Sequence, residues 1–198
     1  MAITRVNEIP TIDVNLVTVQ RSDMVGAPEF ILDTSSKIAV EPQMNDQEAV
    51  QLIVKGVLKA QKKKSSTLTG NQITLTDNVF TPELVLLLQG GEIQYKLGDD
   101  DQPTDEIIGY IPPVAGSTVE KAVFTLKAYS AVYDAAGNIL KYECISYPNC
   151  TGQPIAFGSE DNVFRVQEYV IDSAPSNGEA PYTITYVSVE DFNEIVTP

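Results

Sequence analysis

The side chains best suited to chemistry lie in an acidic run between positions 99 and 106. Five carboxylates occupy these eight positions, and they belong to Asp99, Asp100, Asp101, Asp105 and Glu106. An EF-hand loop needs alternating oxygen ligands, a glycine at its sixth position and a glutamate at its twelfth, and this register is absent. The run is interpreted as a solvated acidic loop, with weak divalent-cation binding as the alternative. No metal site is predicted.

The residue types on which most enzymes rely are missing. The sequence has no histidine, which excludes Ser-His-Asp and Cys-His catalysis and removes the commonest zinc ligand. No phosphate-binding glycine loop, nucleophile elbow or CxxC pair occurs. The sequence therefore predicts a protein without catalytic residues and without a cofactor. Two alternatives stay open: a hydrolase that uses two carboxylates, and a monomeric β-sandwich that binds carbohydrate, as an adhesin does, through some of the nine tyrosines.

Charge and composition narrow the class of protein further. The 198 residues carry 13 basic and 27 acidic side chains, a net charge of −14, whereas proteins that bind nucleic-acid phosphates need the opposite excess. The length and an apolar share of 43% fit one folded domain, or one domain with an arm. No secretion signal and no apolar run of about 20 residues is visible, so a cytoplasmic protein without membrane insertion is expected.

The two cysteines, Cys144 and Cys150, are six positions apart. An oxidised pair would close a short loop, whereas a reduced pair would act as small buried hydrophobic residues. Two cysteines do not make the disulfide framework of a small secreted domain. The reduced state is therefore favoured.

The elements that position these residues are mostly strands. Within residues 1–36, alternation at Ile12, Val14 and Leu16 predicts one strand, and the stretch after Arg21 is a loop by composition. This strand pairs either with a neighbouring copy's sheet or with the edge of its own. A second short strand is predicted over residues 37–41.

A long hairpin is predicted over residues 50–76. Alternating apolar and polar residues over 50–61 favour a strand, with a helix as the alternative. The lysines at 62–64 and two serines form a basic tip, and a threonine-rich strand returns over 67–76. The tip is interpreted either as a solvated turn that blunts aggregation or as a contact for an acidic surface on another copy.

A short helix over about residues 81–89 is the clearest local signal. Thr81 suits the N-cap, Pro82 the first helical position and Gly90 the left-handed C-terminal position. Five consecutive apolar residues surround the helix axis, so the helix is expected to be covered on every side. The residues assigned to this packed helix are Thr81, Pro82, Leu84, Leu86, Leu87 and Leu88.

The second half of the chain also predicts strands. A hairpin is expected over residues 122–147, and further strands at Phe157, over 164–171 and over 182–189. The chain is divided into an N-terminal arm and loop at 1–36, a β domain at 37–189 and an acidic tail at 190–198. The fold class expected is mainly β, a sandwich or partial barrel with long hairpins and one packed helix.

The order of these pieces resembles the major tail tube protein of tailed bacteriophages and phage-tail-like particles, over about residues 35–190. The segments that carry the resemblance are Lys37–Gln43, Val50–Thr76, Asp77–Glu83 with the helix to Gly91, Ala122–Tyr147, Tyr147–Gly152 and Gln167–Ile171. The similarity is one of order and texture rather than of an invariant motif.

The resemblance implies a structural virion protein. Such subunits form homo-hexameric rings in which hairpins of neighbouring copies join into a closed β-barrel, and the rings stack into a hollow tail tube through which DNA passes during ejection. Its implied partners are further copies of itself, the tape measure protein, the baseplate or tip, and the terminator, with DNA only as cargo in transit. The implied location is the virion tail, assembled in the cytoplasm of the host bacterium.

The residues predicted to contact other subunits are oppositely charged. They are the lysines Lys62, Lys63 and Lys64 and the aspartates Asp99, Asp100 and Asp101. Stacked rings make a heterologous contact that does not close, and such a contact builds a filament.

Overall fold

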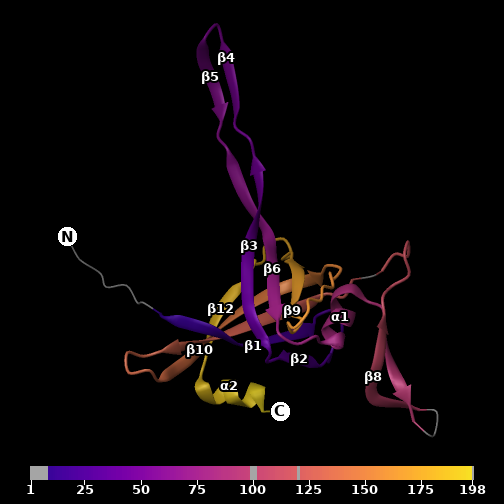
Figure 1. Ribbon diagram of the computed structural model, residues 1–198. Helices are drawn as coiled ribbons and strands as arrows, with labels where there is room; N and C mark the ends of the chain where they lie inside the picture. The colour runs from indigo at the N-terminus through magenta and orange to yellow at the C-terminus, as the bar shows by residue number, and fades with distance from the viewer. Residues whose placement is uncertain (1–8, 99–101, 120, 198) are drawn as a thin grey trace.

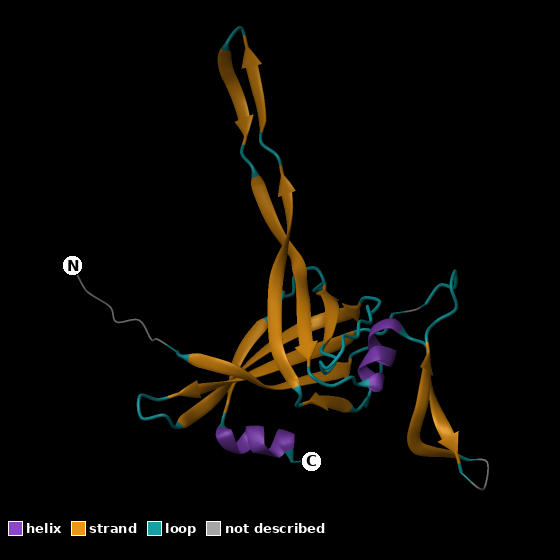
Figure 2. Cartoon of the chain, viewed as in Figure 1, coloured by secondary structure: helices purple, strands orange, loops and turns teal. Residues whose placement is uncertain are grey.

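The computed structural model describes residues 9–98, 102–119 and 121–197. Its elements, in chain order, are β1 (Thr11–Arg21), β2 (Glu29–Leu32), β3 (Ser35–Gln47), β4 (Val50–Val54), β5 (Val57–Lys62), β6 (Ser65–Asp77), α1 (Pro82–Gln89), β7 (Glu92–Leu97), β8 (Pro103–Ile111), β9 (Phe124–Tyr133), β10 (Ile139–Gly152), β11 (Gln167–Ser173), β12 (Thr183–Val187) and α2 (Val189–Val196). The protein is mainly β, as predicted, and the hairpins that extend from its body are visible in Figures 1 and 2.

The body is one folded sheet with the order β2-β1-β9-β10-β11-β6-β3, and β12 pairs with β10 beside this path. Strand β10 makes the fold possible because it changes partners along its length: residues 142–146 pair with β12 and residues 150–152 with β11. Between these two segments the register shifts from Tyr147 to Cys150, and Asn149 within the shift has a left-handed φ of 49°. Such bulges let a strand pass from one layer of a sandwich to the other.

The main core fills the space between these layers. Alternate residues of β6 and β11 point into it, among them Ile73, Leu75 and Tyr169, and they meet Val17 and Leu126 from the opposite layer. This alternation is the period of two that buries one face of a strand. The layers are sandwich-like, but the strands of this chain do not close into a barrel. Closure into a ring would need further copies.

The N-terminal strand lies inside the sheet. Of the two alternatives for it, the single chain shows pairing with its own strands, because β1 is hydrogen-bonded to β2 on one side and to β9 on the other. Hence β1 is not an edge strand. At the other end of the chain, residues 189–196 form the helix α2, which covers a second, smaller core through Phe192.

Helix α1 forms where the sequence predicts it, from Pro82 to Gln89. Gly90 follows with a φ of 73°, and its N–H donates to Leu86 O. Two details of the prediction are wrong. The Thr81 side chain makes no capping hydrogen bond, and Leu86 remains 37% exposed, so the helix is open on one side. Leu84, Val85, Leu87 and Leu88 are buried.

A long hairpin forms, but the predicted pairing is wrong: residues 50–61 contain a turn instead of forming one strand, and residues 67–76 pair with β3. Strands β3 and β4 lead outward and β5 and β6 return, with the turn at Lys55–Gly56. Both turn residues have positive φ, 52° and 78°, as the two central residues of a type I′ hairpin turn require, and glycine adopts this conformation freely. Lys62–Lys64 instead lie midway along the hairpin, where β5 ends at Lys62, opposite Val50, and β6 begins at Ser65.

The remaining elements include one confirmed hairpin and one that the sequence did not suggest. Strands β9 and β10 form the hairpin expected over 122–147. Strands β7 and β8 form a separate two-stranded sheet, and Asp105 and Glu106 of the acidic run lie in β8 instead of in the predicted loop. The predicted strand at 164–171 begins only at Gln167, after a long loop.

Candidate assembly interface

A hairpin arm, defined here as residues 41–69, projects from the body (Figure 1). Every residue in it is exposed, whereas the next residue, Gly70, is buried against β11. From residue 42 to residue 54 the arm extends about 40 Å, at ~3.3 Å per residue. Its outer part, the pair β4–β5, makes no substantial contact with any other element of the described chain.

One face of the outer arm is apolar. The register pairs Leu52 with Ala60 and Val54 with Val57, and directly paired residues lie on the same face of a hairpin. This face therefore holds Val50, Leu52, Val54, Val57 and Ala60, with Lys62 opposite Val50 at its base, while the exposed pair Ile53–Leu58 lies on the other face. Leu52 is 56% exposed, and the valines are similarly open. A two-stranded hairpin is marginally stable alone in water, and exposed apolar surface of this kind marks an interface.

The arm is also basic on an acidic protein. It holds five lysines against three acidic residues, a net charge of +2, which leaves −16 for the rest of the chain. Lys64 forms an ion pair with Asp46 at 2.8 Å, and Lys62 donates to Gln47 Oε1 at 3.1 Å. The Lys64 ammonium and the Ser66 hydroxyl hold the pKa of the Asp46 carboxyl below its usual value.

The predicted contact residues are thus only partly free to meet another subunit. Lys62 and Lys64 are engaged within the arm, while Lys63 forms no ion pair among the described residues. Asp99, Asp100 and Asp101 lie outside the described residues. Beside them, Lys96 pairs with Glu106 at 2.7 Å across β7 and β8. The contact between the lysines and these aspartates stays a prediction.

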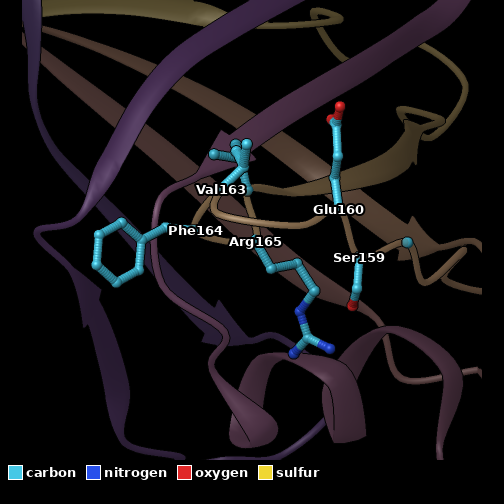
Figure 3. A pocket seen from close by; sticks show the side chains of 7 residues that line it. Ser159, Glu160, Val163, Phe164 and Arg165 are labelled. Atoms are coloured by element: carbon cyan, nitrogen blue, oxygen red, sulfur yellow. The ribbon is translucent and has the colours of Figure 1, made fainter.

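A second exposed apolar region is the loop between β10 and β11 (Figure 3). The Phe164 ring is 93% exposed, and a hollow of about 390 Å³ lies beside it. The Arg165 guanidinium lies over the Phe80 ring, 4.6 Å from its centroid, and faces Phe157 at 5.5 Å. This stack anchors the loop to the segment that precedes α1. The sequence patterning pointed to strands at Phe157 and from residue 164, whereas the structure has no strand between residues 153 and 166.

The third feature is a free sheet edge. Among the described strands, β12 pairs with β10 alone, and its residues 183–186 are exposed, with Ile184 and Tyr186 on the same face. The Lys141 ammonium lies 3.7 Å from the Tyr186 ring centroid and covers part of that face. Strands β2 and β3 form the two ends of the main sheet. Unpaired strand edges are templates for pairing with another chain.

The described residues also bear on chemistry of other kinds. Among them, no three histidine, cysteine, aspartate or glutamate side chains gather as metal ligands would. Both cysteines are unpaired and buried, and burial raises the pKa of the Cys150 thiol to about 12. No helix within the described ranges is long and apolar enough to cross a membrane.

Comparisons with known proteins give little. No family model matches the chain, and no curated protein matches it. One solved structure that aligns with it is a chain from "Cryo-EM structure of the anti-feeding prophage (AFP) baseplate, 6-fold symmetrised". The two are 8% identical, the alignment covers 96% of this chain and 99% of that chain, and the TM-score is 0.32. At this TM-score neither fold nor function is transferred.

Proposed function

We propose that the protein is a structural subunit of a phage tail or phage-tail-like particle, a tail tube protein that assembles into stacked hexameric rings around a channel for DNA. The observation that carries the proposal is the hairpin arm. Its apolar face is exposed, and the arm projects away from the body formed by the described residues. Exposed apolar surface of this kind favours cover by another molecule.

Charge favours another copy of the chain as that molecule. The arm has a net charge of +2 and the rest of the chain −16, so an arm is attracted to the body of a second copy. Because the arm and the surface that receives it differ, the contact is heterologous. Repeated head to tail, it makes a ring if the rotation closes and a filament if it does not. A stack of rings combines closing contacts within each ring with non-closing contacts between rings.

The free edges suggest how a ring would close. If β12 of one subunit paired with β2 of the next, the sheet would continue from subunit to subunit around the ring, and the outer edge of β3 would stay unpaired. This is the closed barrel that the resemblance to tail tube proteins implies. The same resemblance supplies the proposed partners: tape measure, terminator, and baseplate or tip proteins, in a virion tail assembled in the bacterial cytoplasm.

Negative-stain electron microscopy of the concentrated protein at moderate salt tests the proposal. Wild-type protein is expected to form rings or tubes with a central channel. The variant L52Q/V57T should form far fewer, because each change removes about 1 kcal/mol of apolar burial from every contact. The matched control is L140Q, at a leucine that is 58% exposed on the β9–β10 hairpin, and it should assemble as wild type does.

Two outcomes would contradict the proposal. One is wild-type protein that stays monomeric and binds glycans on an array, which would favour the carbohydrate-binding adhesin. The other is assembly that the L52Q/V57T variant leaves unchanged, because the arm would then have no part in the contact.

A further inference from the structure

The loop between β10 and β11 carries an apolar surface that its own chain does not cover. We name it the loop patch, and its members are Phe157, Val163, Phe164 and Val166. Each exposes at least half of its surface, and Phe164 exposes 93%. An aromatic side chain of this kind is a frequent anchor of a protein interface. The hollow of about 390 Å³ beside it has room for aliphatic side chains from a partner.

The loop patch is held in shape before any partner arrives. The guanidinium of Arg165 stacks on Phe80 and Phe157, and the two rings lie 5.9 Å apart. The Gln167 amide donates to Ala156 O at 2.9 Å, which ties the end of the loop to its beginning. Such preorganisation lowers the entropy cost of binding. In Figure 3 Arg165 extends toward α1, while the Phe164 ring points away from it.

The outward charge of the loop is acidic. Arg165 is engaged by the aromatic rings, and Glu160 and Asp161 form no ion pair among the described residues. Glu160 also lines the hollow. On the hairpin arm, Lys55 at the turn and Lys59 on β5 are likewise without an ion pair in the described chain. The two surfaces are apolar at their centres and opposite in charge at their rims.

We propose that the loop patch of one copy receives the apolar face of the hairpin arm of a second copy. Leu52 and Val57 enter the hollow beside Phe164, and Lys55 and Lys59 lie against Glu160 and Asp161. The proposal rests on the self-assembly proposed above and adds to it the receiving surface. The occupant is a second copy, because the rims of the two surfaces carry opposite charge and the outer arm has no substantial contact with any other element of the described chain.

A charge exchange tests the pairing. The variants K55E/K59E and E160K/D161K are each expected to raise the protein concentration needed for polymer about tenfold at low salt, as two exposed ion pairs would. The combined variant restores both pairs with reversed sign and should return to within about threefold of wild type. The control for net charge is E190K/E194K, which makes on α2 the same change of charge as E160K/D161K. Combined with K55E/K59E, it should not restore assembly.

A cross-link tests the geometry independently of charge. Protein with L52C is mixed with protein with F164C under oxidising conditions, and a disulfide-linked heterodimer is expected because the proposed contact brings these two positions together. The native cysteines are both buried and do not compete for the cross-link. Polymers that form without this cross-link, or without rescue in the combined variant, overturn the docking site and leave the proposed function standing. Wild-type protein that forms no polymer at any concentration overturns both.

Discussion

Replacing Phe192 with alanine is expected to release α2 from the sheet. Phe192 is 6% exposed and is the one residue of α2 that is buried. Its ring stacks on Tyr142, with centroids 3.6 Å apart and planes 15° from parallel, and meets the Tyr129 ring edge-on at 5.7 Å. Leu16 and Ala131 complete this second core.

The expected loss of unfolding free energy is about 3 kcal/mol. Replacing a buried phenylalanine with alanine costs about 3–5 kcal/mol when a cavity remains, and each aromatic pair adds about 0.5–1.5 kcal/mol to the burial of area alone. Helix α2 is only eight residues long, so the variant can lose the helix from the sheet instead of keeping a cavity. Because the helix can detach in this way, the loss of unfolding free energy is expected at the lower end of the range of about 3–5 kcal/mol.

Urea denaturation followed by circular dichroism measures this loss. The control V196A, at an exposed position on the same helix, should change the unfolding free energy by less than about 0.5 kcal/mol. A chain that ends at Ser188 should lose about as much as F192A, since both lack the same docking contact. A loss below about 1 kcal/mol in F192A would refute the reasoning, because α2 would then not depend on its aromatic stack.

Four further predictions concern packing, thiol labelling, the pH dependence of stability, and assembly. A Cβ at Gly152 would lie 2.4 Å from the Leu88 backbone, so G152A should lose more than about 2 kcal/mol in a urea titration, whereas G158A, with nothing within 4 Å, should lose less than about 0.5 kcal/mol. Because burial raises the pKa of Cys150 from 9.0 to about 12, iodoacetamide at pH 8 should label it only after unfolding, as mass spectrometry would show, and rapid labelling of native protein would contradict this. The folded state holds that proton more tightly than the unfolded chain, so stability should fall as the pH rises from about 9 to about 12. Changing Lys62–Lys64 to serine should shorten tubes and weaken their response to salt, and unchanged micrographs would exclude these lysines from the contact.

The sequence predicted those elements whose signal is local. Alternation over 122–147 predicted the hairpin of β9 and β10, because a strand with one buried face shows its period wherever it lies in the fold. Proline at the first position and glycine after the last predicted α1 for the same reason. The Thr81 cap failed because a residue that suits the N-cap need not use its side chain there.

Other features were missed although the sequence carries a sign of them. Gly56 interrupts the alternation of 50–61, and Lys-Gly between two apolar runs is compatible with a tight turn. The tip was predicted at Lys62–Lys64 instead of at Gly56, because a charged cluster is typical of loops. The sequence gives no sign of the loop patch, because it does not show whether an apolar residue such as Phe164 is buried or exposed in the folded chain.

The charge distribution gives the proposed assembly its direction. Two bodies of −16 repel each other, and two arms of +2 repel weakly, so the favourable encounter is arm with body. Apolar burial alone would not make this distinction, because the apolar face of one arm could cover that of another. At about 0.15 M salt charges act over only ~8 Å, which keeps the selection local to the rim of the contact. Raising the salt further should therefore leave the apolar attraction in place while removing the discrimination, and regular tubes should give way to irregular aggregates rather than to monomers.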